Sequence, residues 1–163
     1  MIYLLRFVKV AVSTLWRPKL NVLDESVVRL RVWPNDLDLN FHMNNGRYLS
    51  MMDLGRLDLF ARSGILFPAL RRGWMPILGE AKIRFRRSLG PFQIYTLRTR
   101  VLAWDEKWFY GEQKFEAKGE VAATALIRGL LRGKEGNILP EEALALGGSV
   151  VASPPLPAAF LTW

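Results

Sequence analysis

The stretch from Asn35 to Ser63 constrains the fold more than any other part of this chain, because a polar loop leads straight into an apolar helix there. In the loop, carboxylate, amide and imidazole side chains alternate with leucine and phenylalanine. Side chains two positions apart point to the same side of an extended segment. The alternation therefore predicts one shared polar face, formed by Asp36, Asp38, Asn40 and His42.

A helix is predicted over residues 48–61, which contain no proline and several strong helix formers. Asn44 or Asn45 is a suitable N-cap for it. The helix is apolar around most of its circumference, so we expect other parts of the chain to surround it. A carboxylate-bearing loop thus precedes the N-terminus of a buried helix, which is a suitable place for catalysis.

Composition excludes several kinds of active site. The chain has no cysteine, which excludes disulfides, thiolate metal sites and a cysteine nucleophile, and its one histidine excludes a multi-histidine metal site. A carboxylate-only metal site and a triad that uses His42 stay formally open, although no Gly-x-Ser-x-Gly elbow is present. The formal charge of +8 suits nucleic acid, an anionic membrane or an anionic small molecule. We expect no nucleic-acid partner, since the chain contains no RNA-binding motif.

Residues 1–25 form a predicted amphipathic extension. Its apolar run is interrupted by two basic residues, is too short to span a membrane and lacks the pattern of a secretory signal, so we expect a cytoplasmic protein. We favour a helix that packs on its own domain or on a second subunit. The alternative is peripheral contact with a membrane through residues 1–15. Both interpretations use the same apolar stripe, which comprises Leu4, Leu5, Val8, Ala11 and Val12.

Five segments have the alternation or the apolar character of strands. They are residues 26–33, 74–87, 92–104, 108–117 and 120–131. The last three are joined by short turns, which predicts an antiparallel meander. One buried helix against about five antiparallel strands gives an α+β domain over residues 26–133. Residues 134–163 follow as a tail with room for one short helix, residues 140–146.

Several charged residues outside the loop are expected to pair with one another rather than bind a ligand. The spacing favours neighbours one turn apart on the helix and residues opposite each other on adjacent strands. The expected pairs are Asp53–Arg56 and Asp58–Arg62 on the helix, and Arg98 and Arg100 with Glu112 and Glu116 across the strands.

The polar loop resembles the signature of hotdog-fold acyl thioesterases. Plant acyl-ACP thioesterases carry a similar Asp-x-Asn-x-His-x-Asn-Asn run, matched here by Asp38, Asn40, His42, Asn44 and Asn45. The spacing from Asp38 to Tyr48 is also similar to that of the bacterial 4-hydroxybenzoyl-CoA thioesterase family, whose catalytic aspartate falls on Asp38. From about Trp33 to Gly133 the chain resembles proteins related to the sixth member of the mammalian thioesterase superfamily. The resemblance implies a hotdog fold, in which the sheet wraps around one long central helix.

Hydrolysis of an acyl thioester, with acyl-CoA as the expected substrate, is the activity that this resemblance implies. Asp38 is the implied nucleophile or general base, and the plant motif assigns orienting roles to Asn40 and His42. A helix N-terminus offers unpaired donors, so the backbone N–H groups of Asn45 and Gly46 are candidates to stabilise an oxyanion. This chemistry needs no cofactor and no metal.

The chain departs from the plant pattern at one position of proposed catalytic importance. Where the plant enzymes read Arg-Arg-Glu-Cys-Gly, this chain has serine and leucine at residues 88 and 89 in place of Glu-Cys. The missing glutamate leaves Asp38 as the best-supported base, with Asp53 on the helix as a reserve carboxylate. The alternative function is a catalytically weak hotdog domain that binds acyl groups or partners, in contact with a membrane.

Substrate binding and assembly are the last expectations from the sequence. Tyr48 is a candidate substrate contact as part of the matched signature. A CoA thioester brings phosphates, for which Arg84, Arg86 and the adjacent Arg87 are candidate partners. A solvated basic face explains these arginines equally well. Because a five-stranded sheet has exposed edges, and hotdog relatives pair with active sites between subunits, we expect a homodimer or tetramer.

Overall fold

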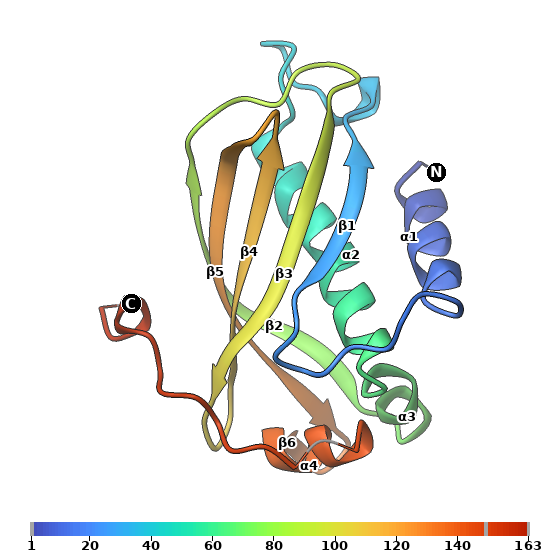
Figure 1. Ribbon diagram of the computed structural model, residues 1–163, viewed down its shortest axis with the longest axis vertical. Coiled ribbons are helices and arrows are strands. Elements are labelled where there is room, and N and C mark those ends of the chain that lie inside the picture. The colour runs from blue at the N-terminus through green and yellow to red at the C-terminus, as the bar shows by residue number, and fades with distance from the viewer. Residues whose placement is uncertain (1, 149, 163) are drawn as a thin grey trace.

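The computed structural model describes residues 2–148 and 150–162. An antiparallel sheet curls around one long helix, α2, and the shorter helix α1 lies outside this pair (Figure 1). The strand order is β1-β3-β4-β5-β2, and β6 pairs with β5. The elements are α1 (Ile2–Ser13), β1 (Ser26–Arg31), η1 (Pro34–Asp36), α2 (Asn45–Arg62), α3 (Leu66–Arg71), β2 (Met75–Phe85), β3 (Ile94–Trp104), β4 (Phe109–Ala117), β5 (Glu120–Gly133), β6 (Gly136–Ile138), α4 (Pro140–Leu146) and η2 (Ala158–Phe160).

The predicted architecture is confirmed in its main elements. The helix expected over residues 48–61 begins at Asn45 and ends at Arg62, with Asn44 as its N-cap. Strands β3, β4 and β5 form the expected antiparallel meander. Residues 140–146 form helix α4, as expected for the tail. The chain is therefore an α+β protein in which a curled sheet surrounds a central helix.

Close contact between α2 and the sheet depends on Gly55 in the middle of the helix. A Cβ atom at this position would lie 2.2 Å from Thr99 Oγ1 and 2.9 Å from Gln113 Nε2. Glycine normally weakens a helix interior, so its presence here reflects the short distance between helix and sheet. On either side of it, α2 buries large apolar side chains, which include Met51, Met52, Leu54 and Leu59.

One buried carboxylate fixes the segment between α1 and β1 to the central helix. Asp58 accepts hydrogen bonds from Arg17 Nη1 at 2.5 Å, Ser26 Oγ at 2.7 Å and Arg62 Nη1 at 3.0 Å. Arg62 Nε also donates to Pro18 O at 2.8 Å. The expected pairing of charged residues is confirmed here and at Asp53–Arg56, Arg98–Glu116 and Arg100–Glu112.

Helix α1 faces the domain with the side opposite to the one that we expected. Arg6 and Val10 point inward and are 8% and 6% exposed, whereas the apolar stripe faces outward. Two Arg6 nitrogens donate to the carboxylate of Asp36 at 2.9 and 2.5 Å, and one of them also donates to Arg31 O at 3.0 Å. Packing of the stripe on its own domain was therefore a wrong prediction, because a buried ion pair sets the rotation of the helix. The outward residues include Leu4, Leu5, Val8 and Val12.

The C-terminal tail returns to the sheet and packs on it. Ala143 and Leu144 of α4 are buried in the apolar cluster at that end of the domain. The ring of Phe160 lies 5.1 Å from the ring of Tyr110 on β4, and the N–H of Trp104 donates to a serine hydroxyl of the tail at 2.8 Å. The tail thus covers part of the sheet.

Strand β2 is an edge strand and is exposed along most of its length. Of its 11 residues, Glu80 and Ile83 are half-buried and the others are exposed. A long edge strand with open apolar side chains readily pairs with another strand. The exposed apolar side chains of β2 include Met75, Ile77, Leu78 and Phe85.

All four tyrosines of the chain have a raised pKa, and burial is the main cause at each of them. Burial raises the pKa of Tyr48 to about 12. Burial also raises the pKa of Tyr95, which lies in the core. At Tyr3 and Tyr110, a neighbouring aspartate adds to the effect of burial on the pKa.

We expect the folded protein to form little tyrosinate near pH 10, where an ordinary tyrosine is about half ionised. The unfolded chain releases these protons at about pH 10 while the folded chain still holds them, so the free energy of unfolding decreases as the pH rises above about 10. An ultraviolet titration of the folded protein checks this, with the same titration in guanidinium chloride as control. Coincident titration curves in the two solutions would contradict the burial of these side chains.

Candidate active site

Asp38 closes a tight turn, residues 38–42, directly before the N-terminus of α2. Its N–H donates to His42 O at 2.9 Å. Its Oδ1 accepts the backbone N–H of Asn40 at 2.9 Å and that of His42 at 3.3 Å. A bridge between Leu37 and Met43 joins the two ends of the turn. The carboxylate is half-buried, and its Oδ2 has no hydrogen-bond partner among residues 2–148 and 150–162.

The polar loop is not extended, so the single polar face predicted for it is wrong. Residues 34–36 form a 3-10 turn, and Phe41 in the following turn has a positive φ of 55°. Asp36 points inward, is 1% exposed and forms the ion pair that holds α1. Asn40 and His42 are exposed, and they remain beside Asp38 because they belong to the same turn.

The N-terminus of α2 lies immediately after this turn. Asn44 Oδ1 accepts the N–H of Gly46 at 2.9 Å, and the N–H of Asn44 donates to Asp36 O at 2.8 Å. The cap therefore uses the N–H of Gly46, one of the two predicted oxyanion donors. The first N–H groups of a helix lack partners within it. The other predicted donor is the backbone N–H of Asn45. Asn45 is exposed and is the first residue of α2, so this N–H group is available for the role.

The structure places Tyr48 in the core beneath the first turn of α2. It is 2% exposed, and its ring centroid lies 5.0 Å from that of Phe85 and 4.8 Å from that of Phe115. Its raised pKa, caused by burial, agrees with this position in the core. Its observed role is packing, and substrate contact through this ring stays a prediction.

The basic residues at the end of β2 differ in their surroundings. Arg84 and Arg86 are exposed and form no ion pair with any other residue of the described ranges. Arg87 Nη2 lies 2.9 Å from Glu120 Oε1, and both side chains are more than half exposed. The first two arginines are therefore open to an anionic ligand, whereas Arg87 is partly neutralised.

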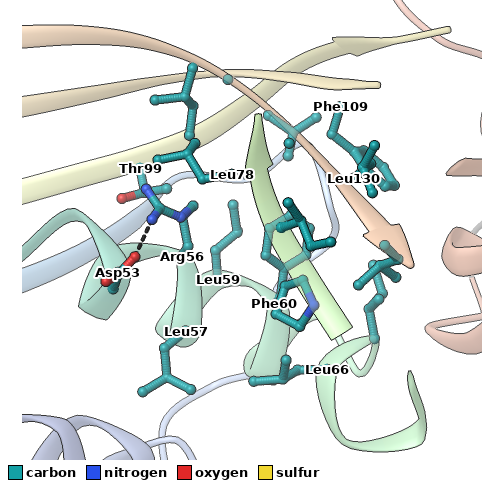
Figure 2. A pocket seen from close by; sticks show the side chains of 18 of the residues that line it. Asp53, Arg56, Leu57, Leu59, Phe60, Leu66, Leu78, Thr99, Phe109 and Leu130 are labelled. Carbon is teal, nitrogen blue, oxygen red and sulfur yellow. Dashed lines mark hydrogen bonds and ion pairs between the residues drawn. The ribbon is translucent and has the colours of Figure 1, made fainter. Parts of the chain in front are cut away.

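A cavity of about 440 Å³ lies between the C-terminal half of α2, the beginning of β2 and the sheet (Figure 2). Its size is typical of small-molecule sites. Asp53, Arg56 and Thr99 gather at one part of its wall. No residue of the Asp38 turn lines the cavity. Asp53, at the cavity wall, lies about 12 Å along the helix from Asn45 at its N-terminus. Most of its wall is apolar and includes Leu57, Leu59, Phe60, Leu66, Leu78 and Leu130.

A chain of polar side chains runs from the centre of the sheet to the rim of this cavity. Gln113 is fully buried, and its Nε2 donates to Thr99 Oγ1 at 2.8 Å and to Met52 O at 2.9 Å. Its Oε1 accepts a hydrogen bond from Arg56 Nη1 at 2.9 Å. Arg56 pairs with Asp53 at the rim (Figure 2). Burial lowers the pKa of Arg56, and the carboxylate of Asp53 opposes this shift.

This network fixes the reserve carboxylate, and the sequence prediction missed two of its members. Gln113 and Thr99 were read only as parts of strands. The available signal was a polar residue at an inward-facing position of β4, between the buried Gly111 and Phe115. Buried amides need partners, so a glutamine in such a series indicates a polar contact across the core.

The described part of the chain, residues 2–148 and 150–162, contains neither a cluster of metal ligands nor a helix that could span a membrane. No three histidine, cysteine, aspartate or glutamate residues cluster there as ligands for a metal ion. None of the helices there is both long and apolar enough to cross a membrane.

Comparison with known proteins decides the family. A sequence model described as the Thioesterase-like superfamily matches residues 32–163, which include the Asp38 turn, α2 and every strand after it. The chain belongs to the thioesterase-like superfamily. The match covers most of the chain and includes the central helix and every strand of the sheet except β1.

Curated relatives of this superfamily member include proteins from animals and fungi. Protein THEM6 of Danio rerio is 40% identical over 141 residues, which cover 84% of this chain and 70% of that protein. Protein THEM6 of Xenopus laevis is 42% identical over 96 residues, 59% of this chain and 46% of that protein. A probable thioesterase of Saccharomyces cerevisiae is 28% identical and covers 71% of this chain and 51% of that protein. The chain thus spans from about half to about two thirds of these proteins.

Solved structures show the same fold. A probable thioesterase from Bartonella henselae superposes with a TM-score of 0.65 at 20% identity and covers 71% of this chain and 98% of that one. A DHNA-CoA thioesterase from Staphylococcus aureus superposes with a TM-score of 0.66 at 15% identity, covering 80% of this chain and 99% of that one. The predicted hotdog fold is therefore confirmed.

Proposed function

We propose that this protein hydrolyses acyl thioesters and that its substrate is an acyl-CoA. The observation that carries the proposal is a half-buried carboxylate, Asp38, in the turn that ends at the N-terminus of α2. A carboxylate and a helix N-terminus supply the base and the electrostatic stabilisation that acyl transfer needs. Relatives named as thioesterases support the reaction. A Staphylococcus aureus protein of the same fold in complex with CoA supports the substrate class.

In the simpler of two routes, Asp38 is a general base. Its Oδ2 accepts a proton from water, the water oxygen attacks the thioester carbonyl carbon, and the C–S bond breaks to release the CoA thiolate, which takes up a proton. In the second route Oδ2 attacks the carbonyl carbon itself, and the C–S bond breaks to release the CoA thiolate, which takes up a proton from water. Water then hydrolyses the resulting anhydride, which releases the free acid and restores the Asp38 carboxylate. In both routes the N–H of Asn45 and the partial charge of the helix N-terminus stabilise the oxyanion.

Asn40 and His42 hold the base in place through their backbone rather than their side chains. Both N–H groups donate to Asp38 Oδ1, which leaves Oδ2 for chemistry. The exposed side chains of both residues stay candidates for contact with water or substrate.

The apolar cavity receives the acyl group in this proposal. One of its walls is the edge strand β2, from Met75 to Leu78. If β2 pairs with the same strand of a second copy, the cavity lies at the subunit interface, and the second copy completes the site. A homodimer thus explains both the exposed edge and the position of the cavity.

Light scattering at micromolar concentration is expected to give the mass of a dimer. Lysine on an edge strand opposes strand pairing, so Ile77→Lys combined with Ala81→Lys is expected to shift the mass toward the monomer. Leu139→Lys, at an exposed position outside β2, is the control and is expected to remain dimeric. A monomeric wild type would remove the two-subunit site from the proposal.

Arg84→Ala combined with Arg86→Ala is expected to raise the KM for acyl-CoA at least several-fold. Each hydrogen bond between a charged group and a phosphate contributes about 1–3 kcal/mol, and contacts with a remote, non-reacting group act largely on binding. A short thioester without the nucleotide provides the comparison, because its KM is expected not to change. Arg132→Ala, at an exposed position of β5, is the matched control and is expected to keep the wild-type KM. Equal KM values for double variant and wild type would assign both arginines to the solvated surface.

Release of free thiol from a panel of acyl-CoAs by the purified protein tests the proposed function itself. Turnover with a clear dependence on the acyl group is the expected result. Binding of acyl-CoA without turnover would overturn the hydrolase and favour the acyl-binding alternative.

A further inference from the structure

Helix α1 carries an apolar face that no part of the described chain covers. Arg6 and Val10 face the domain, and α1 lies on the outside of the molecule beside β1 and α2 (Figure 1). The open face continues past the end of the helix into the following turn. Its residues and exposed fractions are Leu4 63%, Leu5 63%, Val8 49%, Val12 42%, Leu15 72% and Trp16 71%. An apolar patch of this kind marks an interaction surface.

The charge around this face selects the partner. No acidic residue precedes Asp24 in the sequence, and Lys9 and Lys19 are exposed next to the apolar face. On the adjoining strand β1, Arg29 and Arg31 are exposed as well. A second copy of this chain would bring a net charge of +8 against these cations. An anionic surface complements them, and it also accepts apolar side chains if it is a lipid surface.

The dimensions of α1 fit a helix that lies in the plane of a membrane. Its 12 residues correspond to about 18 Å of helix, which is too short to cross the hydrocarbon layer. Apolar side chains on one face and lysine at its border are the pattern of interfacial helices, where the lysine stem stays apolar and its ammonium reaches the headgroups. Trp16 at the end of the face is a residue type enriched at membrane interfaces.

We propose that α1 and the turn after it dock the protein on an anionic lipid surface through the Leu4, Leu5, Val8, Val12, Leu15 and Trp16 face. The ion pair between Arg6 and Asp36 holds the helix in the orientation that presents this face. The neighbouring side chains Tyr3 and Phe7 line the cavity beside α2. Docking therefore brings a wall of the cavity to the lipid surface, where long acyl chains partition. That last consequence rests on the proposed function, whereas docking itself does not.

Flotation with vesicles tests the proposal without any measurement of activity. The full chain is expected to float with vesicles of phosphatidylcholine mixed with phosphatidylglycerol, and to float less with phosphatidylcholine alone. Leu4→Gln combined with Val8→Gln removes two apolar anchors but keeps good helix formers. We expect this variant to lose at least about tenfold in partitioning. Leu139→Gln with Leu161→Gln, at positions that are 55% and 72% exposed elsewhere, is expected to float like the wild type.

The remaining outcomes overturn the proposal. Wild-type protein that stays in the lipid-free fraction, or a Leu4/Val8 variant that floats as well as the wild type with an unchanged circular dichroism spectrum, excludes docking through this face. Light scattering adds a third outcome: a wild type that does not float, and whose oligomer dissociates in the Leu4/Val8 variant, assigns the face to a second copy instead.

Discussion

Replacing Asp38 with asparagine is expected to lower kcat for acyl-thioester hydrolysis by about 100-fold or more, with the melting temperature almost unchanged. Loss of a general base typically costs two to four orders of magnitude. The fold survives because an asparagine Oδ1 can still accept the backbone N–H groups of Asn40 and His42, which keeps the turn closed. Steady-state kinetics and thermal unfolding of the same sample separate the two effects.

The chain offers a matched control for this substitution in the turn between β3 and β4. Asp105 Oδ1 accepts the N–H groups of Lys107 and Trp108, both at 2.7 Å, in the same kind of turn outside the proposed site. Asp105→Asn is therefore expected to leave kcat unchanged. Near wild-type turnover of Asp38→Asn would remove Asp38 from the mechanism, and Asp53 at the cavity rim would become the candidate base, to be tested as Asp53→Asn.

Most of the fold follows from local patterns in the sequence. The apolar run from Tyr48 to Ala61 predicted the central helix, and Asn44 as its cap, because both signals involve residues within a few positions of each other. The short turns of the β3-β4-β5 meander and the ion pairs one helical turn apart are local in the same sense. Patterns of this kind depend on propensity and periodicity alone.

The features that the sequence did not reveal depend on residues far apart in the chain. Alternation placed Asp36 on a face with Asp38, whereas Arg6, 30 positions earlier, draws Asp36 into the core. The same contact turns the apolar stripe of α1 outward. Gln113 joins α2 to the sheet across 61 positions through Met52 O. A pairing between distant polar residues leaves no periodic signal in a single sequence.

The contact between Arg6 and Asp36 is also an interaction whose loss is expected to lower stability strongly. Both side chains are buried, with exposures of 8% and 1%. Removing one partner of a buried pair leaves the other charge without compensation and costs about 3–5 kcal/mol. Arg6→Met is therefore expected to lower the free energy of unfolding by about that amount, which corresponds to a fall of roughly 10 °C in melting temperature. Arg98→Met is the comparison, because the two ion pairs that it breaks, with Glu25 and Glu116, are more exposed than Arg6–Asp36. It is expected to lower the free energy of unfolding by about 1 kcal/mol or less.

A second substitution separates the charge at this site from its packing. In Arg6→Met combined with Asp36→Asn, a neutral amide replaces the buried carboxylate. Asp36 accepts a hydrogen bond from the N–H of Trp33 at 2.8 Å, and the amide oxygen of the asparagine can still accept it. The double variant is expected to recover part of the stability that Arg6→Met loses, because the unpaired charge causes most of that loss. Urea unfolding of the wild type, of Arg6→Met, of Asp36→Asn and of the double variant gives the coupling free energy between the two side chains. A coupling near zero would mean that the pair does not fix α1, and the outward orientation of its apolar face would then need another cause.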